Sequence, residues 1–248
     1  MYHSVTFGDK NTWDDWKLIA TSRPVINPPK QKTKTVDIPG ADGHIELSTS
    51  ISGYPVFDNR TGSLTFYVDN GYMSWHARLT QISDYLHGRT MRLVLEDEPD
   101  YFYEGRFEVD KWASNKDYSQ ITINYDLKPY KWYITKSTED WLWDPFSFEN
   151  GIIQPVIFKN IVVESSTYKE YTFDGDKFMR APVTPIFNVV STNGIYCRYV
   201  SEDMGVVEQL LPNGSTSDIG CILNGASDVT IEFKGFGTVS ITFRSGRL

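Results

Sequence analysis

The chain has 248 residues, of which 40% are hydrophobic, 23% are charged and 15% are aromatic, and its formal net charge is −8. This composition is typical of a folded protein and excludes extensive disorder, while the length favours two domains over one. The acidic balance argues against a nucleic-acid-binding domain, which needs a basic footprint. The densest basic stretch, Lys30, Lys32 and Lys34, alternates with polar residues and is interpreted as a solvated loop or strand edge.

The two cysteines and the beginning of the chain bear on the compartment. Cys197 and Cys221 are too few for a secreted disulfide scaffold, and their separation matches no zinc motif. The two could meet across a sheet, but free buried thiols are predicted. Residues 1–4 lack a basic region followed by an apolar run, and no window approaches 18 apolar residues. We therefore expect no signal peptide, no membrane span and synthesis in a cytoplasm.

Residues 1–62 indicate two short strands followed by an arm. In residues 1–20, apolar residues among polar ones favour a strand, a turn and a second strand. Residues 21–62 are punctuated by prolines and glycines and contain two short alternating runs, 35–38 and 44–47. The connection between them, residues 39–43, holds Pro-Gly and Asp-Gly, which favour tight turns and positive φ. The pattern predicts an extended arm over about 21–62 rather than a compact core.

Residues 60–130 show the patterns of an antiparallel sheet with one helix. Leu64, Phe66 and Val68 alternate with polar residues, and so do apolar residues within 91–95, 101–109 and 121–127. Between them, apolar residues recur at spacings of three and four. This spacing predicts a helix at about 71–87, with Asn70 as N-cap and Gly88 as the stop. We expect one helix packed on an antiparallel sheet or small barrel.

The C-terminal half differs in pattern. Periodicity is lost in residues 128–150 while aromatic residues persist, so we place the domain boundary at residues 133 and 134. From residue 151 onward, Asp-Gly and Asn-Gly pairs at positions 174, 193, 213 and 224 separate alternating runs. Asn-Gly between such runs is a strong hairpin signal, and several short strands spaced by turns predict a β-sandwich over 134–248.

No pattern of catalytic or metal-binding residues emerges from the sequence. Nucleophile elbows, P-loops, dinucleotide fingerprints and zinc-protease motifs are absent, and the four histidines are not spaced as metal ligands. The acidic run 96–100 is the best candidate for carboxylate chemistry. A solvated hairpin tip is favoured there over a glycosidase pair or a calcium site. We therefore predict a protein that is not an enzyme and that uses no cofactor or metal.

Three aromatic residues before the predicted sandwich leave a second function open. Trp141, Trp143 and Phe146 are candidate sugar-binding or docking residues, because aromatic platforms bind sugars. Packing at the domain junction is favoured over that role. A carbohydrate-binding adhesin module that contacts the host surface is nevertheless the alternative function.

Several segments keep their order across about residues 1–133 and together resemble the N-terminal region of phage distal tail proteins. They include Trp13-Asp-Asp-Trp-Lys-Leu-Ile, Ser22-Arg-Pro-Val-Ile-Asn-Pro-Pro, Val36-Asp-Ile-Pro-Gly-Ala-Asp-Gly, Gly53-Tyr-Pro-Val-Phe-Asp-Asn-Arg-Thr-Gly, Leu95-Glu-Asp-Glu-Pro and Tyr125-Asp-Leu-Lys-Pro-Tyr-Lys-Trp. The C-terminal half carries little recognisable motif, as expected of a more variable second domain.

The resemblance implies a fold and an assembly. The fold is mainly β: a ring-forming N-terminal domain of strands with one helix and an extended arm, then a galectin-like β-sandwich. Such proteins form homohexameric rings that join the major tail tube protein to the tail-tip hub or tail-associated protein. The tape measure and receptor-binding proteins are further expected partners. The implied location is the virion tail tip, after assembly in the bacterial host cytoplasm, with no specific nucleic acid and no membrane as partner.

The arm is the candidate interface of such a ring. Strands with unpaired edges invite pairing with another chain, and a head-to-tail contact that closes makes a ring. An acidic lumen is expected in a channel that passes DNA without holding it. The candidate interface residues are Arg23, Pro24, Ile26, Pro28, Ile38, Gly40, Asp42, Gly43, Tyr54 and Arg60.

Overall fold

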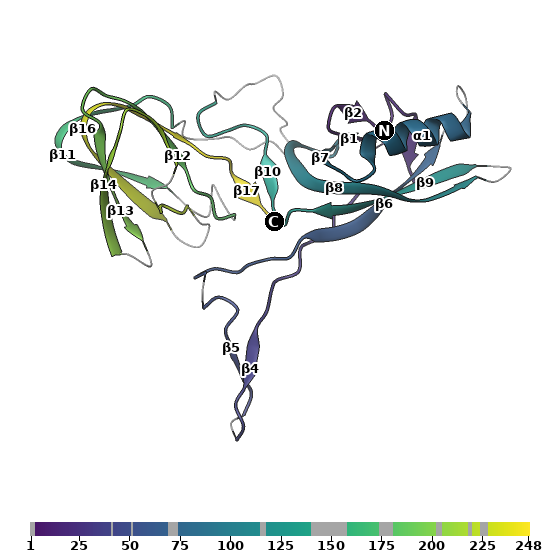
Figure 1. Cartoon of the computed structure of the whole chain (residues 1–248), viewed down its shortest axis with the longest axis horizontal. Coiled ribbons are helices and arrows are strands. Elements are labelled where there is room, and N and C mark those ends of the chain that lie inside the picture. Colours follow the sequence, from purple (N-terminus) through teal and green to yellow (C-terminus); the bar gives the residue numbers. More distant parts are fainter. Residues whose placement is uncertain are drawn as a thin grey trace. The chain divides into compact units, whose positions relative to one another are not determined.

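The computed structural model describes residues 3–40, 42–50, 52–68, 74–114, 118–139, 158–173, 181–201, 205–217, 220–223 and 228–248. In these ranges the chain is mainly β with one helix, which confirms the expected fold class at that level (Figure 1). The chain divides into two compact units, residues 1–131 and 132–248. Within the described ranges, no helix is long and apolar enough to cross a membrane.

Unit 1 is built on an antiparallel sheet with the strand order β2-β1-β7-β8-β9-β6-β3. Along β9, every second residue from Ser119 to Leu127 is buried, as the alternation in the sequence predicts. The buried face packs around Phe7, Phe66 and Phe107, which are fully buried. The strands are β1 (Val5–Phe7), β2 (Lys10–Asn11), β3 (Leu18–Ala20), β6 (Arg60–Val68), β7 (Arg89–Leu95), β8 (Glu98–Ser114) and β9 (Ser119–Leu127).

Helix α1 (Trp75–Leu86) covers one face of this sheet, with Ile82 and Leu86 fully buried. The predicted helix is confirmed, but its expected start and N-cap are wrong. The helix begins four residues later than expected, because the side chain of Ser74 accepts a hydrogen bond from the Ala77 N–H and caps it. Asn70, the expected cap, lies outside the described residues. Gly88, at φ +75°, follows the last turn, as predicted.

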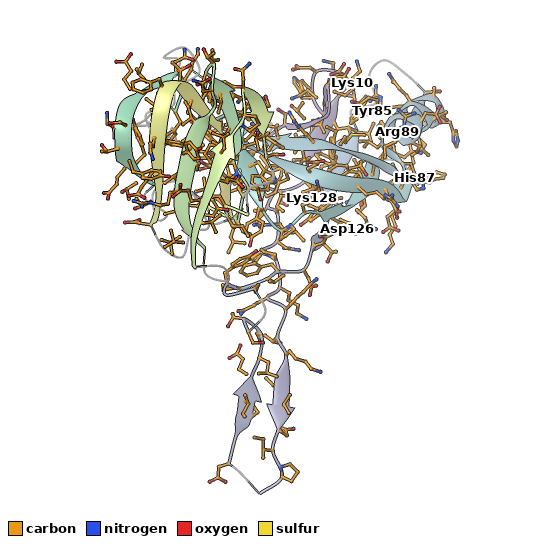
Figure 2. The ribbon with its side chains drawn as sticks, turned by 60° about the vertical axis from the view of Figure 1, so that its left-hand side comes forward. Lys10, Tyr85, His87, Arg89, Asp126 and Lys128 are labelled. Atoms are coloured by element: carbon orange, nitrogen blue, oxygen red, sulfur yellow. The ribbon has the colours of Figure 1, made fainter. Side chains whose placement is uncertain are left out.

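The arm of unit 1 contains the two predicted strands, β4 (Thr35–Asp37) and β5 (His44–Glu46). They pair antiparallel, with Val36 opposite Ile45. A second point of pairing, between Gln31 and Phe57, joins the two halves of the arm nearer its root. In Figure 1 and Figure 2 no other described segment of unit 1 lies beside the β4–β5 hairpin.

Unit 2 contains a six-stranded sheet with one long, shared strand. One edge of β16 pairs with β11, while its other edge pairs with β13 at residues 231–235 and with β12 at residues 238–242. Gly235 and Gly237 lie between these two regions at φ +143° and +149°. A side chain at Gly237 would clash with the carbonyl of Val190, so glycine is needed where two strands part along one edge. The strands are β11 (Ile161–Phe173), β12 (Ile186–Val190), β13 (Ile195–Ser201), β14 (Gly205–Leu211), β15 (Gly214–Thr216) and β16 (Val229–Thr242). Outside this sheet, β10 (Lys131–Tyr133) and β17 (Gly246–Arg247) pair with each other.

Unit 2 has one hydrophobic core, to which β12, β13 and the shared strand β16 all contribute. Phe187 lies on β12, Cys197 on β13, and Ile231 and Ile241 on the shared strand itself, and all four are fully buried. Two expected hairpins are wrong: Asn193-Gly194 and Asn213-Gly214 join strands that do not pair with each other. At both places the chain passes between two regions of the same edge of β16, because β12 pairs with β15 at one region and β13 pairs with β14 at the other.

Both cysteines are free and buried, as predicted. Burial raises the pKa of the Cys221 thiol to about 12 and raises the pKa of Cys197 as well. We expect neither thiol to react with a disulfide reagent at pH 8 in the folded protein, because the thiolate is the reactive form. Titration in denaturant should then release two equivalents, and rapid labelling of the native protein would contradict this prediction.

Candidate functional site

The hairpin of the arm has one apolar face that nothing in the described chain covers. Val36 and Ile45 face each other across the ribbon, and residues two positions along a strand share its face. Ile38 and Leu47 therefore lie on the same side. The exposed fractions of these four residues are 40% to 48%. An exposed cluster of this kind, at the end of an extended arm, marks a contact surface.

The turn of the hairpin depends on two glycines. Gly40 and Gly43 have φ of +85° and +76°, which glycine adopts without steric cost. A Cβ at either position would meet no atom within 4 Å, so backbone conformation alone selects glycine there. Ile38 and Asp42 beside the turn are exposed. Of the predicted interface residues, these four therefore lie together at the tip of the arm.

The side chains of Arg60, Asn27 and Tyr125 form a clasp at the root of the arm. The Arg60 Nη1 atom donates to the carbonyl of Asn27 at 3.1 Å, and Arg60 Nε donates to the carbonyl of Pro129 at 2.8 Å. Asn27 in turn donates from its side chain to the carbonyl of Thr61, and its N–H donates to the Tyr125 hydroxyl. Gly62 has no side chain because a Cβ would collide with that hydroxyl. These bonds tie the departing and returning chains of the arm to the sheet.

Arg60 is buried, with 4% of its surface exposed, and its guanidinium lies over the Tyr103 ring. Burial lowers the pKa of Arg60, whereas Tyr103 and Glu98 act to raise it. Ile26 is also buried, within the core of unit 1. Arg60 and Ile26, predicted as interface residues, therefore lie inside unit 1, and their part in an interface stays a prediction. Both anchor the arm to its own subunit, because side chains buried inside unit 1 leave little surface for a neighbour.

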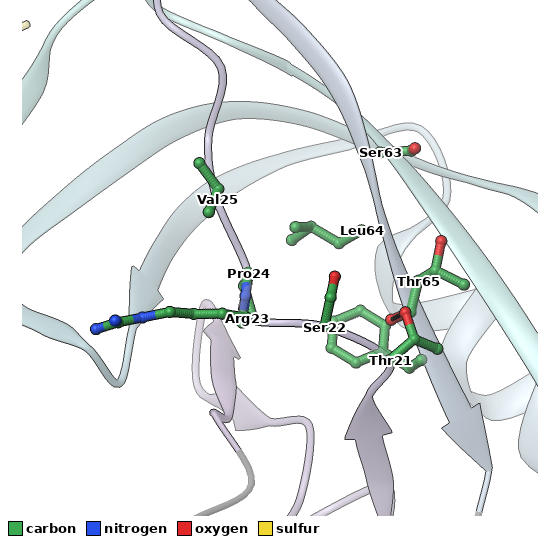
Figure 3. Close-up of a pocket in the computed structure, with 9 residues that line it drawn as sticks. Thr21, Ser22, Arg23, Pro24, Val25, Ser63, Leu64 and Thr65 are labelled. Carbon is green, nitrogen blue, oxygen red and sulfur yellow. Dashed lines mark hydrogen bonds between the residues drawn. The ribbon is translucent and has the colours of Figure 1, made fainter.

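A polar bay opens where the arm leaves the sheet. It has a volume of about 290 Å³ and is lined by Thr21–Val25 on one side and Ser63–Phe66 of β6 on the other. Figure 3 shows Leu64 pointing into the space between the two segments. The bay exists because β3 pairs with β6 only at Phe66, Tyr67 and Val68 before the chain turns away. We call this feature the arm-root bay.

Arg23 lies at the rim of the arm-root bay and is tied to the acidic run. Its Nε atom donates to Asp97 Oδ2 at 2.8 Å, and the other oxygen of Asp97 lies 3.1 Å from His3 Nδ1. Glu96 accepts from the Ser4 N–H, and Glu98 is paired with Lys131. Glu96 and Asp97 form the tip of the β7–β8 hairpin, as predicted, whereas Glu98 already belongs to β8. These three acids are engaged by protein groups rather than only solvated.

Asp97 predicts a pH-dependent contribution to stability. Burial would raise the pKa of Asp97, but hydrogen bonds from His3 and Arg23 outweigh it and lower the pKa below the ordinary 3.8. The stabilisation is therefore present above pH 3.8 and is lost as the pH falls through the lowered pKa. We expect Asp97→Asn to be less stable than the wild type at pH 7, with the difference shrinking towards pH 3 in urea unfolding. A difference that grows on acidification would contradict this.

The remaining predicted site residues are dispersed. Pro24 lines the arm-root bay, Pro28 is exposed, and Tyr54 is half-buried on the returning chain of the arm. Trp141, Trp143 and Phe146 lie outside the described residues. Sequence reasoning missed Val36, Ile45 and Leu47 as candidate contact residues, although the alternation of residues 35–38 and 44–47 carried the signal. It also missed Val25, which is 65% exposed beside the bay.

The described residues contain no group of three or more histidine, cysteine, aspartate or glutamate side chains placed to hold a metal ion. What the arrangement provides instead is a surface for association: an uncovered apolar ribbon, a rigid root and an open sheet edge. These features suit binding to another protein chain.

Comparisons with known proteins bear on the fold of the chain. No protein-family model matches the sequence, and no curated protein matches it. Among solved structures, the chain is similar to the Dit protein of phage SPP1, described as a paradigm of the hub adsorption apparatus in phages that infect Gram-positive bacteria. The similarity covers 100% of both chains with a TM-score of 0.66 and 12% sequence identity. The resemblance to phage distal tail proteins is thus confirmed at the level of the fold, and the chain has the fold of this hub protein along its whole length.

Proposed function

We propose that this chain is a structural component of a phage tail tip, without enzymatic activity. The observation that carries the proposal is the likeness in fold to the SPP1 Dit protein over the full length of both chains. A shared fold alone does not imply a shared function. The arm supports the proposal independently, because a ribbon with an uncovered apolar face is suited to assembly rather than to a small substrate.

The finer proposal is a homohexameric ring. The arm of each subunit reaches its neighbour, and the repeated head-to-tail contact closes. On this proposal the ring joins the major tail tube protein on one side to the tail-tip hub or tail-associated protein on the other. The tape measure and receptor-binding proteins are further proposed partners, the virion tail tip is the location, and the host cytoplasm is the place of assembly. The net charge of −8 suits a lumen that DNA passes through without being held.

The test is the mass of the purified protein in solution. We expect light scattering after size exclusion, over a range of concentrations, to show a discrete species of about six subunits, as a closed ring requires. Negative-stain images of that species should show rings. A strict monomer that also fails to form a ring with the tube or hub protein would overturn the ring. A melting temperature that rises with host-wall glycans would favour the adhesin alternative, since a ligand of the folded state stabilises it.

A further inference from the structure

In the arm-root bay, the edge of β6 that faces the departing chain is only partly hydrogen-bonded. Thr65 accepts from Thr21 through its carbonyl at 3.0 Å, and Thr61 accepts from the Asn27 side chain at 3.0 Å. Main-chain groups of alternate residues point to the same edge of a strand, so those of Ser63 point there too. Within the described chain, no bond from the segment 22–26 reaches Ser63. The bay is therefore a short, open stretch of sheet edge.

Apolar side chains lie beside this edge. Val25 is 65% exposed on the departing segment, and Leu64, which is only 5% exposed, forms part of the floor of the space opposite it (Figure 3). Open main-chain groups next to apolar side chains are what an added β-strand needs, since the backbone supplies hydrogen bonds and alternate side chains fill the space.

We propose that the arm-root bay of one subunit receives the hairpin tip of the arm of a second copy. This inference rests on the proposed ring and names the acceptor of its arm. Among the described strands, β4 and β5 pair only with each other, so each has one open edge that could pair with Ser63. The apolar face of the hairpin, with Val36 and Ile38, then covers Val25.

The hairpin cannot reach the bay of its own chain. Main-chain hydrogen bonds from Lys32 to Val56, from Asp58 to Lys30 and from Leu47 to Lys34 hold the two halves of the arm as an extended ribbon. At about 3.3 Å per residue, the span from Lys30 to Asp37 places the hairpin roughly 23 Å beyond the base of the ribbon. A second copy is therefore the occupant whose hairpin is free to enter.

Charge complementarity supports the same occupant. The Arg23 side chain at the rim is 67% exposed, and only its Nε atom is engaged by Asp97. The hairpin carries Asp37, Asp42 and Glu46, all exposed. Docking brings the acidic tip, with Asp42 beside the turn, to the guanidinium of Arg23. Unlike charges at the rim of a contact set its register and speed association.

The experiment combines a charge exchange with a cross-link. Arg23→Glu and Asp42→Arg are each expected to weaken self-association about tenfold, and the double variant is expected to recover most of it, because the pair is restored with reversed charges. In parallel, Val25→Cys and Ile38→Cys variants are purified separately, mixed and oxidised. A covalent dimer on non-reducing gels, present in the mixture and absent from each variant alone, is the expected result. The native cysteines are buried and do not interfere.

The outcomes separate this proposal from the ring itself. Rings from the wild type, with no cross-link and with both charge variants assembling normally, would overturn the docking site and leave the ring standing. A cross-link in the mixture, with recovery in the charge-exchanged variant, supports the docking site. A wild type that stays monomeric and yields no cross-link even at the highest concentration counts against both.

Discussion

Arg60→Ala is expected to lower the free energy of unfolding of unit 1 by about 2–4 kcal/mol, because two main-chain carbonyls lose a charged donor and a buried volume is emptied. The carbonyls are those of Asn27 and Pro129, and the emptied volume lies against the Tyr103 ring. Part of the loss is offset, since the Nη2 atom of Arg60 is buried without a partner among the described residues. Hydrogen exchange during urea titration resolves the effect, because peptides of β6 and β9 report on unit 1 and those of β16 on unit 2.

Arg23→Ala is the matched control for this prediction. It is an arginine at the same root of the arm, but its side chain is 67% exposed, and within the described chain its ion pair is with Asp97. Exposed pairs contribute about 0–1 kcal/mol, so exchange in β6 should change little. Comparing Arg60→Ala with Arg23→Ala distinguishes a residue that stabilises unit 1 from one that only contacts a neighbouring subunit. If Arg60→Ala abolished assembly while leaving exchange in β6 unchanged, Arg60 would act at the interface after all.

Local pattern predicted most of unit 1, because its elements are specified by nearby residues. The stripe ending at Ile82 and Leu86 determined the helix, and alternation determined strands such as β9. The start of the helix was missed because Asn70 and Ser74 are both good capping residue types, and the apolar spacing does not choose between them. Similarly, a charged residue such as Arg60 is expected outside, and only the converging carbonyls of Asn27 and Pro129 account for its burial.

Strand pairing in unit 2 was not predictable from turn signals. Asn193-Gly194 and Asn213-Gly214 have the chemistry of a tight hairpin, and Gly194 does have positive φ. The strands on either side nevertheless pair elsewhere, because β16 binds β12 and β13 along one edge and forces the chain to cross between them. The candidate site likewise depends on strand pairing that the sequence does not reveal. The arm was predicted from composition, but the arm-root bay was not, because it exists only where β3 stops pairing with β6.

Replacing both Gly40 and Gly43 with valine is expected to weaken assembly at least about tenfold while leaving both units folded. A β-branched residue at positive φ costs about 1–2 kcal/mol, so the two substitutions disfavour the turn that joins β4 to β5. No atom lies within 4 Å of either added Cβ, so the strain stays in the turn and does not reach the core. The mass in solution measures assembly, and circular dichroism with urea unfolding measures the fold.

The control for the glycine variant is Gly205→Val with Gly214→Val in unit 2. These glycines also have positive φ, +69° and +108°, and open space around the missing Cβ. The control therefore carries the same kind of backbone strain without altering the arm. If the control assembles normally and the arm variant does not, the shape of the hairpin is required for association. If both assemble normally, a ring does not need the ordered hairpin, and the contact between subunits must be sought on the sheet of unit 1.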